Sequence, residues 1–133
     1  MDSSDPAPRP ASVPSILVVD DDPTFCAIMS EVLKLYRAEV HVAMSAAEAL
    51  LYLQTMTPDL ILTDVMMPEV DGLTLVRRIR AGELFARVPV IVVSAGVSTR
   101  EQAAALQAGA DSFLPKPFSL RELQAAVSTI LPD

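Results

Sequence analysis

The sequence predicts an α/β domain in which a parallel β-sheet is covered by helices on both faces. Short apolar runs rich in β-branched residues, at 16–19, 60–62 and 90–93, are typical of strands buried on both sides. Segments with apolar residues at helical spacing lie between these runs. Strand and helix patterns alternate five times in about 117 residues, which favours a doubly covered parallel sheet.

Composition supports a single folded domain and excludes several classes of site. The chain has 133 residues, of which 51% are hydrophobic and 20% charged, enough to bury a core. A formal net charge of -7 argues against direct binding to nucleic acid or to anionic membranes. A single cysteine, Cys26, and a single histidine, His41, exclude an internal disulfide, a cysteine zinc site and a histidine-pair metal site. We expect Cys26 in the core and His41 as a surface or packing residue.

The domain is expected to begin after a short tail. Residues 1–14 contain four prolines with Ser and Asp and have no apolar h-region, which predicts a flexible tail and no signal peptide. No apolar run reaches the roughly 18–20 residues that a membrane span needs. We therefore expect a tail at 1–14, a domain at 15–133, and a cytoplasmic location.

In the first half of the domain, the run 16–19 ends in three aspartates, and a helix follows with Pro23 in its first turn. Residues 39–44 alternate and predict a second, more exposed strand with Val40 and Val42 on its apolar side. Apolar residues at helical spacing in the first helix are Phe25, Ile28, Met29, Val32, Leu33 and Tyr36.

Three later helices begin with the Ser-x-x-Glu pattern of a capping box, at 45–48, 98–101 and 119–122. The helix between the first and the second of these follows Gly72. The second, which begins at 98–101, is rich in alanine and reaches Gly109. Strands are expected at 60–62, 90–93 and 113–114. The apolar helix positions expected to be buried are Ala46, Leu50 and Leu53, then Leu75, Val76 and Ile79, and last Leu120, Leu123, Val127, Ile130 and Leu131.

Polar residues that carry chemistry follow four of the five strands. In a parallel sheet the carboxyl ends of the strands share one edge, where ligands bind. That edge would collect the following residues: Asp20, Asp21 and Asp22 after the first strand, Asp64 after the third, Ser94 after the fourth and Lys116 after the fifth. Each alone is a common turn, cap, loop or surface residue, but their joint placement at one edge argues for a site.

Several carboxylates placed together repel one another unless a cation lies among them. Oxygen ligands without His or Cys point to Mg²⁺. A metal ion, a hydroxyl and an ammonium group suit a phosphoryl group, and a carboxylate nucleophile would take it as an acyl phosphate.

The sequence resembles the response regulator receiver domains of two-component signalling. The resemblance covers about Ser15 to Leu131 and rests on five motifs in matching order and spacing. They are Ile16-Leu17-Val18-Val19-Asp20-Asp21-Asp22, Leu60-Ile61-Leu62-Thr63-Asp64-Val65-Met66-Met67-Pro68, Asp71-Gly72, Val93-Ser94-Ala95 and Lys116-Pro117-Phe118.

The resemblance implies a (βα)5 flavodoxin-like fold with strand order 2-1-3-4-5. It implies that Asp64 is the phosphoacceptor, that Asp21 ligates Mg²⁺ directly, and that Asp20 acts mainly through water. The backbone carbonyl of Met66 would supply a further ligand. Lys116 would pair with the phosphoryl group or with Asp64, and its peptide bond to Pro117 would be cis.

A switch is also implied. Ser94 would move toward the phosphoryl oxygen, and Phe113, at an aromatic switch position, would fill the space from outside. The face formed by the fourth helix, fifth strand and fifth helix would then be remodelled. Because the fourth helix is dominated by alanines at 103–105 and 108, we expect a small free-energy gap between its two arrangements.

The implied partners are a sensor histidine kinase or phosphotransfer protein, docking near the first helix and the loop after the fifth strand. An output domain, a downstream protein or a second copy would use the switching face. Such a chain is a signalling domain that catalyses only its own phosphorylation and dephosphorylation. Met66 and Gly96 stand where family side chains position the hydrolytic water, so we predict slow self-dephosphorylation, which a lifetime of seconds would contradict.

Two alternatives remain at this point. Asp20-Asp21-Asp22-Pro23-Thr24 also fits the start of haloacid dehalogenase-like phosphatases, in which Asp20 would be the nucleophile. That family needs a further acidic pair after the lysine, where this chain offers only Glu122 and Asp133. The other alternative is a receiver-like interaction module that takes no phosphate.

Overall fold

The computed structural model describes residues 13–65, 67, 71–82, 87–95 and 98–131. Its five strands form one sheet in the order β2-β1-β3-β4-β5, with all neighbours parallel, and this confirms the predicted fold class and strand order. Along the chain the elements are β1 Ser15–Val19, α1 Pro23–Leu33, the 3-10 helix η1 Lys34–Tyr36, β2 Glu39–Ala43, α2 Ala46–Leu53, β3 Leu60–Thr63, α3 Gly72–Ala81, β4 Val90–Ser94, α4 Thr99–Ala108, β5 Ser112–Pro115 and α5 Leu120–Ser128.

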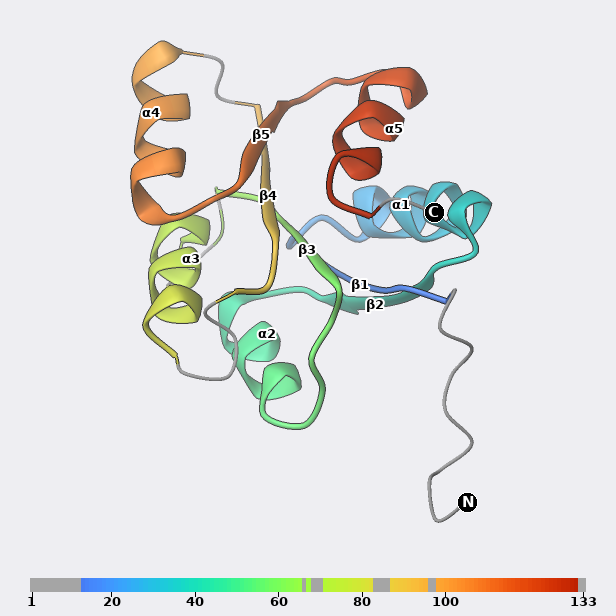
Figure 1. Ribbon diagram of the computed structural model, residues 1–133, viewed down its shortest axis with the longest axis horizontal. Coiled ribbons are helices and arrows are strands. Elements are labelled where there is room, and N and C mark those ends of the chain that lie inside the picture. Colours follow the sequence, from blue (N-terminus) through green and yellow to red (C-terminus); the bar gives the residue numbers. More distant parts are fainter. Residues whose placement is uncertain (1–12, 66, 68–70, 83–86, 96–97, 132–133) are drawn as a thin grey trace.

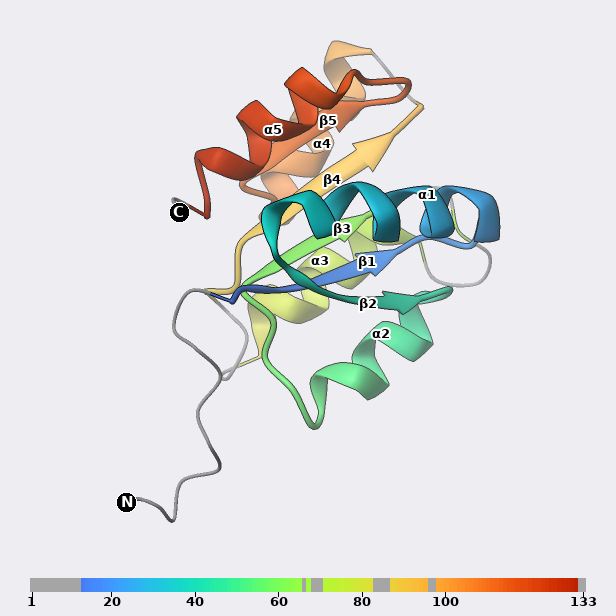
Figure 2. The same cartoon turned by 90° about the vertical axis from the view of Figure 1, so that its right-hand side faces the viewer.

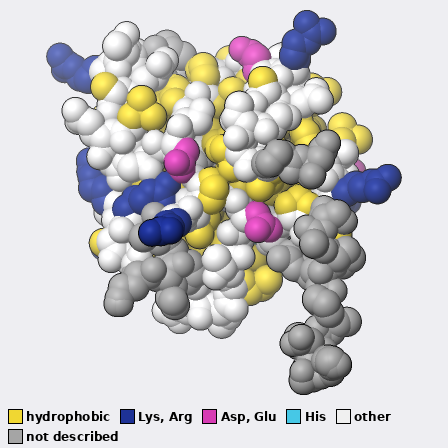
Figure 3. All heavy atoms as spheres, in the orientation of Figure 1, with side chains coloured by type: hydrophobic (Ala, Val, Ile, Leu, Met, Phe, Trp, Pro, Cys, Tyr) yellow, Lys and Arg dark blue, Asp and Glu magenta, His cyan; other side chains and the backbone are white. Residues whose placement is uncertain are grey.

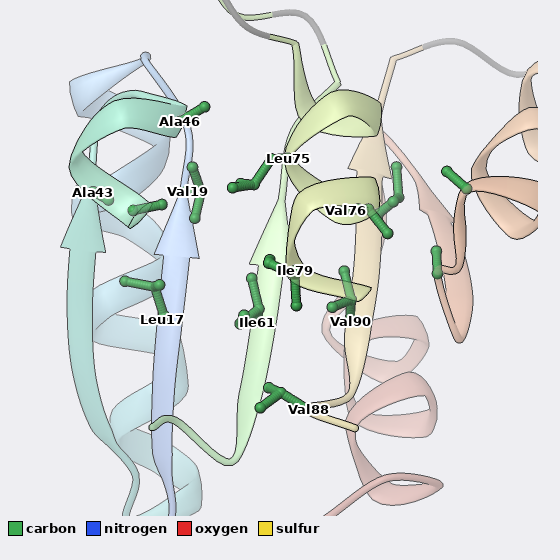
Figure 4. Packing of buried hydrophobic residues seen from close by; sticks show 14 of the residues in the cluster. Leu17, Val19, Ala43, Ala46, Ile61, Leu75, Val76, Ile79, Val88 and Val90 are labelled. Atoms are coloured by element: carbon green, nitrogen blue, oxygen red, sulfur yellow. The ribbon is translucent and has the colours of Figure 1, made fainter. Parts of the chain in front are cut away.

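Helices cover both faces of the sheet, as the continuous apolar strands require. α1 and α5 lie on one face, and α2, α3 and α4 lie on the other (Figures 1 and 2). Alternate residues of each central strand enter the two cores, so that Leu17 and Val19 face α2 and α3 whereas Ile16 and Val18 face α1 and α5. Figure 4 shows the first of these cores, with Leu75 pointing from α3 toward the strands.

Each α-helix begins at a side-chain cap. Ser98 and Ser119 form complete capping boxes with the glutamates three residues later, as predicted. The box predicted at 45–48 is only half formed. Ser45 accepts from the amide of Glu48, but the Glu48 carboxylate accepts from Met44 N at 2.8 Å, one residue before the cap.

Arg80, near the end of α3, ties together the edge of the sheet opposite the strand carboxyl ends. Its guanidinium donates to the carbonyls of Gly109 at 2.8 Å and Val88 at 2.6 Å, and to Asp111 Oδ2 at 2.7 Å. The same Asp111 oxygen accepts from Val90 N at 2.8 Å, so one cluster fixes the start of β4 and the turn between α4 and β5. The neighbouring arginines of α3 are solvent-exposed, and basic side chains lie over this helix in Figure 3.

Some expectations about burial are wrong. In β2, Ala43 is buried and Val42 is 40% exposed, because α2 begins just after Ala43 and folds over that face of the edge strand. Ile28 and Leu120 are 54% and 59% exposed, since they lie at the rim of a surface groove rather than beneath a helix. In α2, Ala49 is fully buried and Leu50 only partly.

Cys26 is buried, as expected, and His41 is half-buried with its ring 5.1 Å from that of Tyr52. The tail predicted at 1–14 lies outside the described residues except for its last two, and the Pro14 carbonyl accepts from Glu39 N at 2.8 Å. Among the described helices, none is both long and apolar enough to cross a membrane.

Candidate functional site

Residues just past the ends of β1, β3 and β5 meet the last residue of β4 at one edge of the sheet, because the backbone ladder continues beyond the strands. Asp20 N donates to Ala43 O at 3.1 Å, and Asp64 N donates to Val19 O at 2.9 Å. Lys116 N likewise donates to Ser94 O at 2.8 Å. The predicted residues are therefore held in register by the sheet itself.

Three carboxylates form a compact acidic cluster at this edge. Oxygen atoms of Asp20, Asp21 and Asp64 lie within 4.8 Å of one another. Asp20 and Asp64 are buried, at 1% and 7% exposure, whereas Asp21 is exposed. Mutual repulsion makes such a cluster unfavourable alone, and three hard oxygen ligands with one open side fit a divalent cation such as Mg²⁺.

The third consecutive aspartate, Asp22, has a different role. Its Oδ1 accepts from Thr24 N at 2.9 Å and caps α1. Its own amide donates to Asp20 Oδ1 at 2.9 Å, which fixes the orientation of the Asp20 carboxylate. The sequence left open whether this run was a capping turn or a ligand set. Asp22 forms the cap, and Asp20 and Asp21 belong to the acidic cluster.

Lys116 pairs more closely with Asp20 than with Asp64. Its Nζ lies 2.8 Å from Asp20 Oδ2 and 3.9 Å from Asp64 Oδ1. We expected a pair with Asp64 or a phosphoryl group. Asp20 holds the ammonium closer because its carboxylate is buried and turned toward the lysine. The Lys116–Pro117 peptide bond is cis, as the resemblance implied.

The loop after β3 presents Asp64 through close packing of backbone on backbone. Val65 N donates to Asp64 Oδ1 at 2.9 Å, and Gly72 N donates to Val65 O at 3.0 Å. A Cβ on Gly72 would overlap the carbonyl oxygen of Asp64. This close approach explains why a glycine follows Asp71, whose side chain caps α3.

Ser94, at the end of β4, is buried at the same edge. Phe113 in β5 is half-buried and packs against the core beneath α2, α3 and α4. Met66 and Gly96, which carry the predicted metal-ligand carbonyl and the predicted hydrolysis rate, lie outside the described residues.

Sequence reasoning missed an aromatic pair beside the lysine. The Lys116 ammonium lies 4.1 Å from the ring centroid of Phe25, and the ring of Phe118 meets Phe25 edge-on at 6.2 Å. These residues line an apolar groove of about 480 Å³ between α1 and the β5–α5 loop. Helical spacing marked Phe25 only as apolar, so no sequence signal connected it with the site.

Cys26 also contacts the backbone of the site. Its Sγ lies 3.2 Å from Asp20 O, to which the thiol donates. Burial, followed by the negative charge of Asp20, raises the pKa of the Cys26 thiol to about 11. The thiol therefore stays protonated at neutral pH and supports the Asp20 backbone rather than acting as a nucleophile.

Comparison with known proteins identifies the family. Residues 16–128 match the response regulator receiver domain. The chain belongs to this family. This assignment favours a receiver over the phosphatase alternative, which the family match does not support.

Relatives and solved structures agree with the assignment. The transcriptional regulatory protein PrrA of Mycobacterium leprae is 43% identical over 120 residues, covering 90% of this chain and 51% of PrrA. BaeR of Escherichia coli, also a transcriptional regulatory protein, is 36% identical over 124 residues, covering 93% of this chain and 50% of BaeR. This receiver chain thus spans about half the length of these relatives.

Two receiver-domain structures match almost the whole domain. The receiver domain of Francisella response regulator 1452 gives a TM-score of 0.81 at 34% identity, covering 89% of this chain and 96% of that one. The receiver domain of sensor histidine kinase PA1611 from Pseudomonas aeruginosa gives 0.82 at 30% identity, covering 90% and 98%. That structure has a magnesium ion coordinated in its active-site cleft.

Proposed function

We propose that the chain accepts a phosphoryl group on Asp64 from the phosphohistidine of a sensor histidine kinase or phosphotransfer protein. The observation that carries this proposal is the placement of the Asp64 carboxylate. It lies within the acidic cluster and 3.9 Å from the Lys116 ammonium, at the carboxyl edge of the sheet. Membership of the receiver family supports the same role.

The donor set fits Mg²⁺. Asp21 and Asp64 would hold the ion directly, Asp20 mainly through water, and the Met66 carbonyl would complete the protein ligands. Magnesium in the PA1611 receiver domain supports this assignment. When bound, the ion neutralises charge on the acidic cluster and on phosphoryl oxygens.

In the transfer step, an Asp64 carboxylate oxygen forms a bond to phosphorus as the bond from phosphorus to the donor breaks. From phosphohistidine the electron pair returns to the phosphorylated nitrogen, and neutral imidazole leaves because the other ring nitrogen carries a proton. From acetyl phosphate it leaves with acetate, and no proton transfer is needed. Lys116 stabilises the equatorial oxygens, and Ser94 donates a hydrogen bond to one of them.

The switching face belongs to the same proposal. Only Ala105 and Ala108 of α4 are buried among its residues, whereas Leu106 is 53% exposed, so little apolar area fixes this helix. Recruitment of Ser94 would let Phe113 move inward, and the α4-β5-α5 face would shift its population. An output domain, a downstream protein or a second copy would read that face.

The kinase or phosphotransfer protein would dock at the apolar groove between α1 and the β5–α5 loop, which opens beside Lys116.

A cytoplasmic location is part of the proposal, since the one thiol of the chain is a free buried cysteine. The division into a tail at 1–14 and a domain at 15–133 also stays a prediction, as does slow self-dephosphorylation.

Incubation with acetyl phosphate and Mg²⁺, followed by intact-mass measurement, tests the proposal. We expect the mass of one phosphoryl group to be added to the wild type and to Asp22→Asn, whose asparagine preserves the cap of α1. We expect none on Asp64→Asn. If Asp64→Asn were phosphorylated and Asp20→Asn were not, the result would favour the phosphatase chemistry. If the wild type took no phosphoryl group, the result would favour an interaction module that takes no phosphate.

A further inference from the structure

The Lys116 ammonium is supported by an aromatic ring as well as by carboxylates. Its Nζ lies 4.1 Å from the centroid of Phe25, inside the range of about 6 Å over which a ring face attracts a cation. The lysine side chain is 22% exposed, and its closest carboxylate is Asp20 at 2.8 Å. Because the ring is neutral, it holds the ammonium without using the charge that a phosphoryl group would need.

The ring itself is held by the loop that carries the lysine. Phe118 meets Phe25 at an interplanar angle of 90° and is only two residues beyond Lys116. Phe25 is the third residue of α1, which starts from the cap at Asp22. The ring therefore joins the acidic loop after β1 to the lysine loop after β5.

We propose that Phe25 is a positioning residue for Lys116, restricting the ammonium to the side of the site that faces Asp64. This inference rests on the proposed function and adds a residue to it. Lysine carries its charge on a flexible four-carbon stem, so the salt bridge to Asp20 fixes the ammonium while leaving the stem more than one path to it. The Phe25 ring removes the arrangements in which the stem turns outward into the groove.

A matched set of variants separates the ring face from simple apolar volume. Phe25→Tyr keeps the ring, Phe25→Leu removes it while keeping an apolar side chain, and Tyr36→Leu is the control. Tyr36 lies in η1 and packs against the same core, on the far end of α1 from the site. Initial rates of phosphorylation by acetyl phosphate with Mg²⁺ are compared with the proton shifts of the Lys116 ε-methylene group.

We expect Phe25→Leu to lower the rate about threefold to tenfold, the size of one partly exposed cation–π contact. The ring-current shift at Lys116 should vanish in this variant. Phe25→Tyr and Tyr36→Leu should keep both the rate and the shift. If Phe25→Leu unfolds, Phe25→Met replaces it with a longer side chain and the same expectation.

Two results would overturn the positioning role. One is a wild-type rate in Phe25→Leu or Phe25→Met. The other is an equal loss of rate in Phe25→Tyr, which would show that shape rather than the ring face matters. In both cases Asp64 of the wild type is still phosphorylated, so the proposed function stands. Failure of the wild type to take phosphate would instead count against the proposed function.

Discussion

Replacing Asp21 with asparagine should make the metal-free protein more stable. Asp21 is the exposed member of the acidic cluster, and its oxygen lies within 4.8 Å of those of Asp20 and Asp64. Asp20 also pairs with Lys116, and Asp64 is the proposed phosphoacceptor. Asp21→Asn therefore removes repulsion and leaves the closest ion pair of the site in place.

Coulomb's law sets the size of the effect. Two unit charges 4.8 Å apart repel by about 0.9 kcal/mol in water and about 3.5 kcal/mol at an effective dielectric constant of 20. Exposure of Asp21 places its interactions toward the lower value. Asp20 is its neighbour in sequence, so that repulsion persists in the unfolded chain and largely cancels. The repulsion from Asp64 remains, and we expect the free energy of unfolding to rise by about 1 kcal/mol.

Urea unfolding with a chelator at low ionic strength measures this change. In 1 M salt the screening length falls to about 3 Å, and because Asp21 is exposed its repulsion is screened, so the gain should shrink. With Mg²⁺ the order should reverse, because ion binding stabilises the folded wild type more than the variant. The matched control is Glu31→Gln, which removes the same charge from an exposed pair with Lys34.

A loss of stability in Asp21→Asn without metal would refute the argument that the cluster is repulsive. So would a gain of the same size in Glu31→Gln, since that would reflect only the net charge of -7. A gain that persists undiminished in 1 M salt would assign the effect to packing or hydrogen bonding instead.

Three further changes test the surrounding structure. Gly72→Ala would place a Cβ 2.8 Å from the carbonyl carbon of Asp64 and should cost about 2–3 kcal/mol in urea unfolding; wild-type stability would contradict this packing. Arg80→Met should cost about 2–4 kcal/mol and speed amide exchange at the start of β4, because two carbonyls and Asp111 lose their donor. With a pKa of about 11, native Cys26 should resist a thiol reagent at pH 8 and react faster as the pH rises toward 11; rapid labelling at pH 8 would disprove this burial.

The sequence predicted the fold well because its signals are local and redundant. Apolar runs marked the strands, and Ser98 and Ser119 marked helix starts by the hydrogen bonds that they make. The errors occur where burial depends on which neighbour covers a residue. Ala43 is buried only because α2 folds back over it, and Leu120 is exposed because it lies at the rim of the groove.

Site residues were predictable as a set, but their pairings were not. Strand ends locate Asp20, Asp64 and Lys116 at one edge without reference to side-chain direction. The choice of Asp20 as the closer partner of Lys116 depends on the amide of Asp22 and on an angstrom-scale difference in distance. The contact with Phe25 joins residues 91 positions apart, and periodicity records only that Phe25 is apolar.

The charges at the site indicate how phosphorylation would change the pairing of Lys116 with Asp20. Three carboxylates and one ammonium leave a local charge of about -2, which one Mg²⁺ would neutralise. Phosphorylation would replace the single negative charge of Asp64 with a group of nearly two. Lys116 lies 2.8 Å from Asp20 and 3.9 Å from Asp64, so a doubled charge on the farther side outweighs the difference in distance. If Asp64 is the phosphoacceptor, as proposed, gain of a phosphoryl group would therefore make the Asp64 side the stronger partner of Lys116. The neutral Phe25 ring contacts the ammonium without adding another negative charge that competes for it.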